Sequence, residues 1–210
     1  VGWKLSRTVA DVPYYFANIE PGNWDNDRYR LRFNAARPLG SAERVVVGVG
    51  ADYALAQHAR YNDPRPDIQY YRLFVEGQLG IHLTDRQVLS GYAGWGQSTE
   101  DASVRNYNEA NDSFGARRYN IFTVAGWGSY QRQQRYRYER PVSHYAIGGA
   151  YFLEHGPWRL NNELTYTRAD MEFDRVGRAG GQRTENRIGT YTHRTLENRL
   201  FADRPGAARP

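Results

Sequence analysis

The fold is decided by three segments within residues 28–89, which read RYRLRFNAA (28–36), VVVGVGADYALA (45–56) and YRLFVEGQLGIH (71–82). In each segment the apolar side chains recur at every second position, which is the period that an extended strand imposes on its two faces. Each alternating run is long enough for a tilted transmembrane strand, which needs about 9–11 residues. The segments therefore predict strands of an antiparallel sheet that has one apolar face and one polar face.

The connections between these segments alternate in length. Residues 38–43 and 83–87 predict short turns, whereas residues 57–68 predict a long loop. A membrane barrel has this rhythm, with tight turns on the periplasmic side and long loops outside. Residues 11–27 predict another long loop, and a glycine-rich loop is expected around residues 177–181.

Further strands are expected at residues 88–98, 142–153, 158–167 and 184–196, with a weak strand end at residues 1–8. The strand pattern at residues 119–130 breaks the order of turns and loops, so we expect residues 97–141 to form one extracellular excursion with its own hairpin. The prediction is an all-β fold: an antiparallel transmembrane β-barrel, or an open fragment of a larger barrel. It has about eight membrane strands plus the extracellular hairpin.

Composition supports one folded domain. The 210 residues are 40% hydrophobic and 14% aromatic, which excludes a disordered chain. We expect a single, partial barrel domain at residues 1–200 and an irregular tail at residues 201–210. The mean hydropathy of −0.80 is compatible with a barrel that has a wet interior, and no apolar run is long enough for a transmembrane helix. The absence of cysteine suits an exported protein.

The alternation assigns side chains to two environments. The positions predicted to line the lumen are Arg28, Arg30, Arg32, Asp52, Arg72, Glu76, Gln78, His82, Arg159 and Glu163, with Arg187 on a later strand. The positions predicted to face lipid are Leu31, Phe33, Val45, Val47, Val49, Leu73, Val75, Leu79 and Ile81. We expect the interior arginines to pair with carboxylates across the wall. In the alternative, unpaired arginines would make a pore prefer anions.

No motif predicts an enzyme, a cofactor or a metal site. Ser143 and His144 point to opposite faces of one strand, and a pair of Ser90 with His82 or His144 would require adjacent strands. Asn23, Asp25 and Asp27 are spaced like the start of a calcium loop, but the glycine and the distal glutamate of that motif are missing. The sequence has no GxSxG, Walker, HExxH or CxxC motif. The arginines are spread along the chain without a compact patch, so no nucleic-acid partner is expected.

Four features together resemble an uncharacterised outer-membrane β-barrel family of the Bacteroidota kind. They are Asn23-Trp24, the 28–36 strand followed by Pro38-Leu39-Gly40, the loop Asp63-Pro64-Arg65-Pro66, and the segment 79–89. The resemblance covers about residues 1–200. It implies an outer-membrane location and a full barrel much longer than this chain, but it brings no activity and no catalytic residues. The prolines of the 63–66 loop are expected to stiffen its tip, and Asp63 favours a turn.

The functional prediction is an outer-membrane barrel protein of a Gram-negative cell, acting as a porin-like pore, a transport component or a subunit of a surface complex. Its expected partners are outer-membrane lipid and other outer-membrane subunits. The alternative is a soluble all-β sandwich or barrel that binds a ligand such as a glycan through exposed tyrosines and tryptophans. The two are hard to separate because the inward face of a sandwich has the same pattern as the outward face of a porin.

Overall fold

The computed structural model describes residues 3–4, 14–18, 23–40, 43–108, 121–125, 130–133, 135–179 and 182–204. All the regular elements in these ranges are β-strands. Over the same residues, no helix has the length and apolar character needed to span a bilayer. The all-β prediction is therefore confirmed for the described part of the chain.

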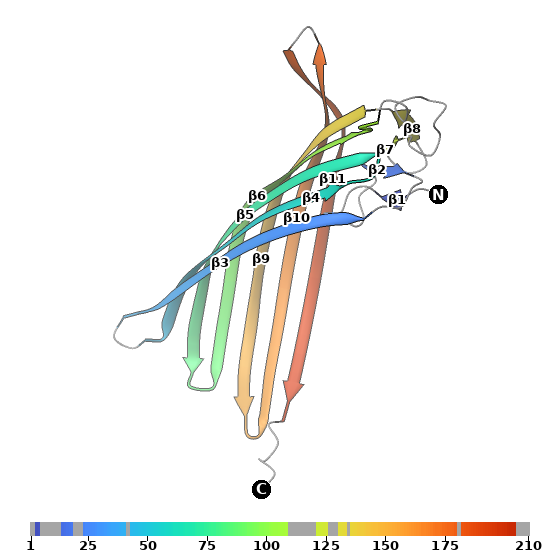
Figure 1. Ribbon diagram of the computed structural model, residues 1–210. Helices are drawn as coiled ribbons and strands as arrows, with labels where there is room; N and C mark the ends of the chain where they lie inside the picture. Colours follow the sequence, from blue (N-terminus) through green and yellow to red (C-terminus); the bar gives the residue numbers. More distant parts are fainter. Residues whose placement is uncertain are drawn as a thin grey trace.

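Most of the chain forms one large, curved antiparallel sheet (Figure 1). Its strands are β3 (Trp24–Leu39), β4 (Val45–Arg60), β5 (Arg65–Thr84), β6 (Gln87–Arg105), β9 (Arg135–His155), β10 (Trp158–Ala179) and β11 (Gln182–Asp203). The order across the sheet is β11-β10-β9-β6-β5-β4-β3, so β3 and β11 are the edges. No pairing joins these two edge strands within the described ranges, and the sheet is open.

A second sheet lies at the end of the large sheet where β4 passes to β5 and β6 ends (Figure 1). It has the strands β1 (Trp3–Lys4), β2 (Tyr14–Asn18), β7 (Ile121–Ala125) and β8 (Tyr130–Gln133), in the order β1-β2-β7-β8. The pairing of β7 with β8 confirms a hairpin within residues 97–141. The bounds predicted for the excursion are wrong, because residues 97–105 belong to β6 and residues 135–141 belong to β9 of the large sheet. We call the end of the large sheet that carries this small sheet the capped end.

Several predicted loops are strands in the structure. Residues 57–68 are not a long loop, because β4 continues to Arg60, β5 begins at Arg65, and only residues 61–64 connect them. The predicted loop at 11–27 contains β2 and the start of β3. Of the predicted glycine-rich loop, residues 177–179 end β10, and residues 180–181 lie outside the described ranges. Of the strand predicted at residues 1–8, the structure describes residues 3–4, which form β1 of the small sheet. Residues 201–203, predicted as tail, end β11, while residues 205–210 lie outside the described ranges.

The missed strand extensions have a common physical cause. Apart from residues 201–203, which are at the opposite end, they lie at the capped end, where polar residues such as His58 and Arg60 are buried on one face. Strand pairing depends on the backbone ladder, so these extensions form without the apolar alternation on which the sequence prediction relied.

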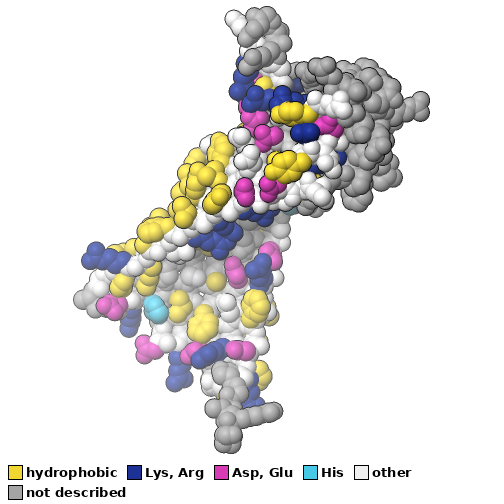
Figure 2. Space-filling model, viewed as in Figure 1, with side chains coloured by type: hydrophobic (Ala, Val, Ile, Leu, Met, Phe, Trp, Pro, Cys, Tyr) yellow, Lys and Arg dark blue, Asp and Glu magenta, His cyan; other side chains and the backbone are white. Residues whose placement is uncertain are grey.

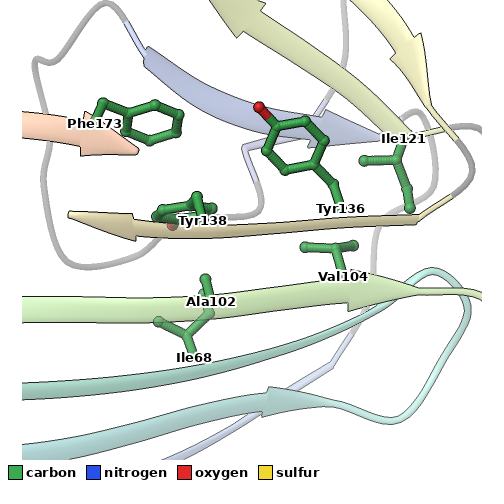
Figure 3. Packing of buried hydrophobic residues seen from close by; sticks show 7 residues of the cluster. All are labelled: Ile68, Ala102, Val104, Ile121, Tyr136, Tyr138 and Phe173. Atoms are coloured by element: carbon green, nitrogen blue, oxygen red, sulfur yellow. The ribbon is translucent and has the colours of Figure 1, made fainter. Parts of the chain in front are cut away.

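The buried core also lies at the capped end. Figure 3 shows its seven residues, which are Ile68, Ala102, Val104, Ile121, Tyr136, Tyr138 and Phe173. Tyr138 and Phe173 stack with their ring centroids 4.8 Å apart. Ile121 comes from β7 and the other six from the large sheet, so this cluster attaches the small sheet to the large one. Away from this end, the large sheet carries many exposed apolar side chains.

Candidate functional site

The strand register separates the large sheet into two faces. Residues directly opposite each other in an antiparallel pair lie on the same face, and successive residues alternate between faces. The face that contains the row Arg30, Ala54, Arg72 and Ser98 is called the polar face, and the face that contains the row Leu31, Tyr53, Leu73 and Gln97 is called the apolar face.

Every position predicted to line a lumen, from Arg28 to Glu163 in the set above, falls on the polar face by this register. Every position predicted to face lipid falls on the apolar face. The lipid set lies together on the neighbouring strands β3, β4 and β5, whereas two members of the lumen set, Arg159 and Glu163, lie apart from the rest on β10. That one face meets water in a lumen and the other meets lipid stays a prediction.

The apolar face is exposed across the full width of the sheet. Leu31 on β3 is 71% exposed, Ile147 on β9 is 59% exposed, and Leu196 on β11 is 70% exposed. Toward the capped end this surface finishes in a border of aromatic side chains, which are Tyr29, Tyr53, Tyr71, Trp95, Tyr145 and Tyr166. In Figure 2 hydrophobic side chains follow the outer contour of the curved sheet, and arginines lie inside the curve.

Asp52 is the central carboxylate of the polar face. Arg30 binds it with both guanidinium arms: Nε donates to Oδ1 at 2.7 Å, and a second bond joins Nη2 to Oδ2. Arg32 approaches the same carboxylate, with Nε 3.9 Å from Oδ2. These contacts are the pairing of arginine with carboxylate that the sequence predicted.

The other charged residues of the polar face differ in their partners. At the end opposite the small sheet, Arg159 pairs with Glu154 at 3.1 Å. Glu76 accepts a hydrogen bond from the Gln78 amide at 2.7 Å. Glu163 accepts one from the Thr165 hydroxyl at 3.4 Å. Arg72 has no ion pair with any residue in the described ranges, although it carries the same charge.

Arg187 does not share the environment predicted for it. A register shift between Phe173 and Asp174 places Ile188 against the core on the polar face. The adjacent Arg187 therefore projects from the other side, where it pairs with Glu172 and, at 3.3 Å, with Asp174. A bulge of this kind reverses the alternation and cannot be read from the spacing of residues.

The structure contains one serine–histidine pair that sequence reasoning missed. The Ser98 hydroxyl lies 2.8 Å from Nε2 of His144, across the β6–β9 pairing. Ser98 is only 2% exposed, so a substrate carbonyl could not reach its oxygen without displacing side chains. Arg72 is the register partner of Ser98, and its positive charge disfavours the imidazolium that proton abstraction would form. The pair is better suited to satisfying two polar groups than to catalysis.

A buried ion pair reinforces the capped end. Nη2 of Arg140 lies 2.8 Å from Oε2 of Glu100, and both side chains are almost fully buried. The Tyr138 hydroxyl donates a hydrogen bond to Oε1 of Glu100. Burial also raises the pKa of the Tyr136 phenol to about 12, an effect that the positive charge of Arg175 partly offsets. The sequence placed these residues in an excursion, so it did not predict this network.

The predicted turn residue Asp63 joins two connections. Its carboxylate accepts hydrogen bonds from the backbone amides of Tyr107 at 3.1 Å and Asn108 at 3.0 Å, and from Nε of Arg65 at 3.0 Å. The Tyr107 ring lies near two guanidinium groups, 4.5 Å from that of Arg65 and 4.4 Å from that of Arg105. The Asp-Pro-Arg-Pro motif therefore fixes residues 61–64 to the end of β6.

The acidic residues considered for calcium lie on β3. Asp25 accepts a hydrogen bond from the Tyr61 hydroxyl at 3.0 Å, which raises the pKa of that phenol above its usual value. Within the part of the chain that the structure describes, no group of three or more histidine, aspartate or glutamate side chains could hold a metal ion.

Comparison with known proteins identifies a family but no role. A model described as a family of unknown function (DUF6850) matches residues 1–208. No curated protein matches the chain, and no solved structure matches it. The outer-membrane location and the barrel family suggested by the sequence therefore stay predictions.

Proposed function

The chain belongs to the DUF6850 family of unknown function, and we propose that its large sheet forms part of the wall of a transport barrel in a bacterial outer membrane. The observation that carries the proposal is the exposed apolar face, which crosses all seven strands of the sheet. A water-exposed surface rarely carries a contiguous apolar patch larger than a few hundred Å². Hydrocarbon is the environment in which such a face is stable.

The dimensions of the apolar face support this proposal. On β3 the apolar face extends from Tyr29 to Leu39. These residues, about eleven at roughly 3.4 Å each, would cover a height of about 26 Å along the membrane normal if the strand is tilted by about 45°. Outer-membrane barrels have an apolar band about 25 Å tall, bordered by aromatic side chains. The aromatic border toward the capped end corresponds to one such girdle, and the exposed Trp158 lies near the opposite end.

The polar face supplies the complementary half of the proposal. It carries arginines, carboxylates and amides on the inside of the curve, as expected for a wall that encloses water. The small sheet packs against this same face through Ile121, at the capped end. This position suits a constriction at one mouth of a transport barrel.

Strand direction determines what must complete the barrel. β3 and β11 both run from the capped end to the opposite end. They point the same way because an odd number of strands, all antiparallel to their neighbours, lies between them. Closing β3 directly on β11 would therefore create a parallel pair. Unpaired backbone groups are not tolerated in hydrocarbon, so each edge is expected to pair with a strand that runs in the opposite direction.

Two neighbouring residues on β5 test the proposal. Leu79 lies on the apolar face and is 45% exposed, whereas Gln78 lies on the polar face and is also exposed. In a membrane, Leu79→Arg should lower the free energy of unfolding by about 2–4 kcal/mol, because the charge enters hydrocarbon. Gln78→Arg is the matched control and should have little effect.

The measurement is urea unfolding of the full-length protein in lipid vesicles. The folded fraction at each urea concentration is determined from the heat-dependent migration of the folded form on a gel. Equal stability of the two variants would argue against lipid contact. If the protein is also monodisperse without detergent, the soluble ligand-binding alternative replaces the barrel.

A further inference from the structure

Arg72 is positioned by an aromatic ring, not by a carboxylate. Its guanidinium carbon lies 5.5 Å from the centroid of the Phe74 ring, two residues along the same strand face. The ring itself lies over two glycines of β6: an added Cβ would come within 2.5 Å of it at Gly94 and within 2.7 Å at Gly96. The glycines thus admit the ring, and the ring holds the guanidinium by a cation–π contact.

The guanidinium held in this way retains unused hydrogen-bonding capacity. Its Nε atom is buried and has no hydrogen-bond partner among the residues that the structure describes. A buried donor without an acceptor carries an uncompensated desolvation cost, so an acceptor at this place would be stabilising. An arginine fork is suited to a planar or tetrahedral oxyanion, which it can bind through two parallel N–H bonds.

A cavity of about 270 Å³ opens beside Arg72. Its lining includes Arg28, Arg30, Asp52, His58 and Tyr70. The space exists because β4, the strand between the arginines, presents only the small side chains of Ala54 and Ala56 to this face between Asp52 and His58.

Positive charge exceeds negative charge around this cavity. Three arginines line it, and Asp52 is its single carboxylate. That carboxylate is already bound by both arms of Arg30. The charge of Arg72 and the charge of Arg28 are therefore available to a ligand, since neither forms an ion pair with any residue in the described ranges.

We infer that this cavity binds a small oxyanion, namely a phosphate, sulfate or carboxylate group carried by a solute, between Arg72 and Arg28. The inference rests on the proposed function in one respect, because it takes the polar face as a water-filled interior that solutes enter. It adds the chemical class of the transported or recognised solute. The two arginines are the binding residues, and Phe74 is a positioning residue.

Calorimetric titration of the purified full-length protein tests the inference, with inorganic phosphate, sulfate and acetate as separate probes at low salt. Arg72→Gln should weaken binding about tenfold or more, as expected for the loss of a charged hydrogen bond. The matched control is Arg159→Gln, which removes the same charge from the same face at a site where Arg159 pairs with Glu154. The affinity of this variant should stay within about twofold of wild type, because the substitution removes only a distant charge, whose effect on the site is weakened by screening.

Three outcomes would overturn the inference. The first is that no probe binds saturably, and the second is that the Arg72→Gln and Arg159→Gln variants bind with equal affinity. The third is that the anions do not compete with one another for binding. Phe74→Leu provides a second variant if Arg72→Gln does not fold. It keeps the charge but removes the ring, and should weaken binding while circular dichroism stays unchanged.

The titration and the membrane tests can fail separately. A protein that needs no detergent but binds phosphate through Arg72 would contradict the barrel and retain the oxyanion site. A protein that inserts in lipid but binds none of the probes would retain the barrel and remove the site.

Discussion

Phe74 shows how single residues shape the polar face. Its ring occupies the space above Gly94 and Gly96, where any larger residue would collide with it. Glycine in a strand normally weakens the strand because it has no side chain to pack. On β6 the neighbouring strand supplies the packing at these two positions, so Phe74 explains why glycine stands at residues 94 and 96.

Gly94→Ala should therefore destabilise the protein. The new Cβ would overlap the Phe74 ring, and overpacking of this kind costs about 1–3 kcal/mol. Gly77→Ala is the control on the paired strand β5, because a Cβ there meets no atom within 4 Å. The measurement is the urea midpoint of each variant in detergent micelles. A loss of stability that is the same at both positions would contradict the assigned role of Phe74.

For single residues, the sequence predicted the face of the sheet to which a side chain points better than it predicted the side chains that it contacts. Alternation alone assigned Arg72 and Leu73 to opposite sides of β5, because side-chain direction depends only on position along a strand. The contact between Ser98 and His144 depends on which strands are neighbours and in what register, which spacing within one strand does not contain. The same limit explains Arg187, which a bulge moves to the other face.

The ends of β6 and β9 at the capped end are stabilised by buried charged side chains and not by apolar packing alone. Here the two strands are joined by side chains that are charged yet buried, of which Arg140 and Glu100 are the clearest pair. Breaking a buried ion pair by removing one partner costs about 3–5 kcal/mol, whereas an exposed pair contributes about 0–1 kcal/mol.

Arg140→Met should accordingly destabilise the capped end by about 3–5 kcal/mol, since it withdraws the guanidinium from the buried Glu100 carboxylate. Arg137→Met on the same strand is the control, because its ion pair with Asp101 is exposed. Hydrogen exchange of the β6 and β9 amides reports the local effect. If the two variants open equally often, the buried pair is not what holds these strand ends together.

Strand ends were the part of each element that the sequence predicted least well. The turns opposite the capped end were predicted near residues 38–43 and 83–87, because turn-forming residues mark them. At the capped end the strands continue past the apolar rows, so the loss of alternation at residues 57–68 was interpreted as a loop. Residues that are polar and buried give no periodic signal to correct that interpretation.

In the part of the chain that the structure describes, the large sheet is open and many side chains of its apolar face are exposed. The core is confined to the capped end, while residues such as Val49, Leu73 and Ile147 are exposed along the apolar face. The sequence predicted an all-β chain, either a barrel or an open fragment of one, because strand patterns are local. It did not predict the small sheet, whose place depends on contacts between residues distant in the chain, such as Ile121 with the large sheet.

Spin-label accessibility at two adjacent residues tests the membrane claim most directly. The chain contains no cysteine, so Leu79→Cys and Gln78→Cys can each carry a single label. In lipid vesicles we predict that the label at residue 79 is relaxed by oxygen, which concentrates in hydrocarbon, and is protected from a water-soluble nickel chelate. The label at residue 78 should show the reverse. Equal access of the nickel chelate to both labels would contradict the assignment of the apolar face to lipid.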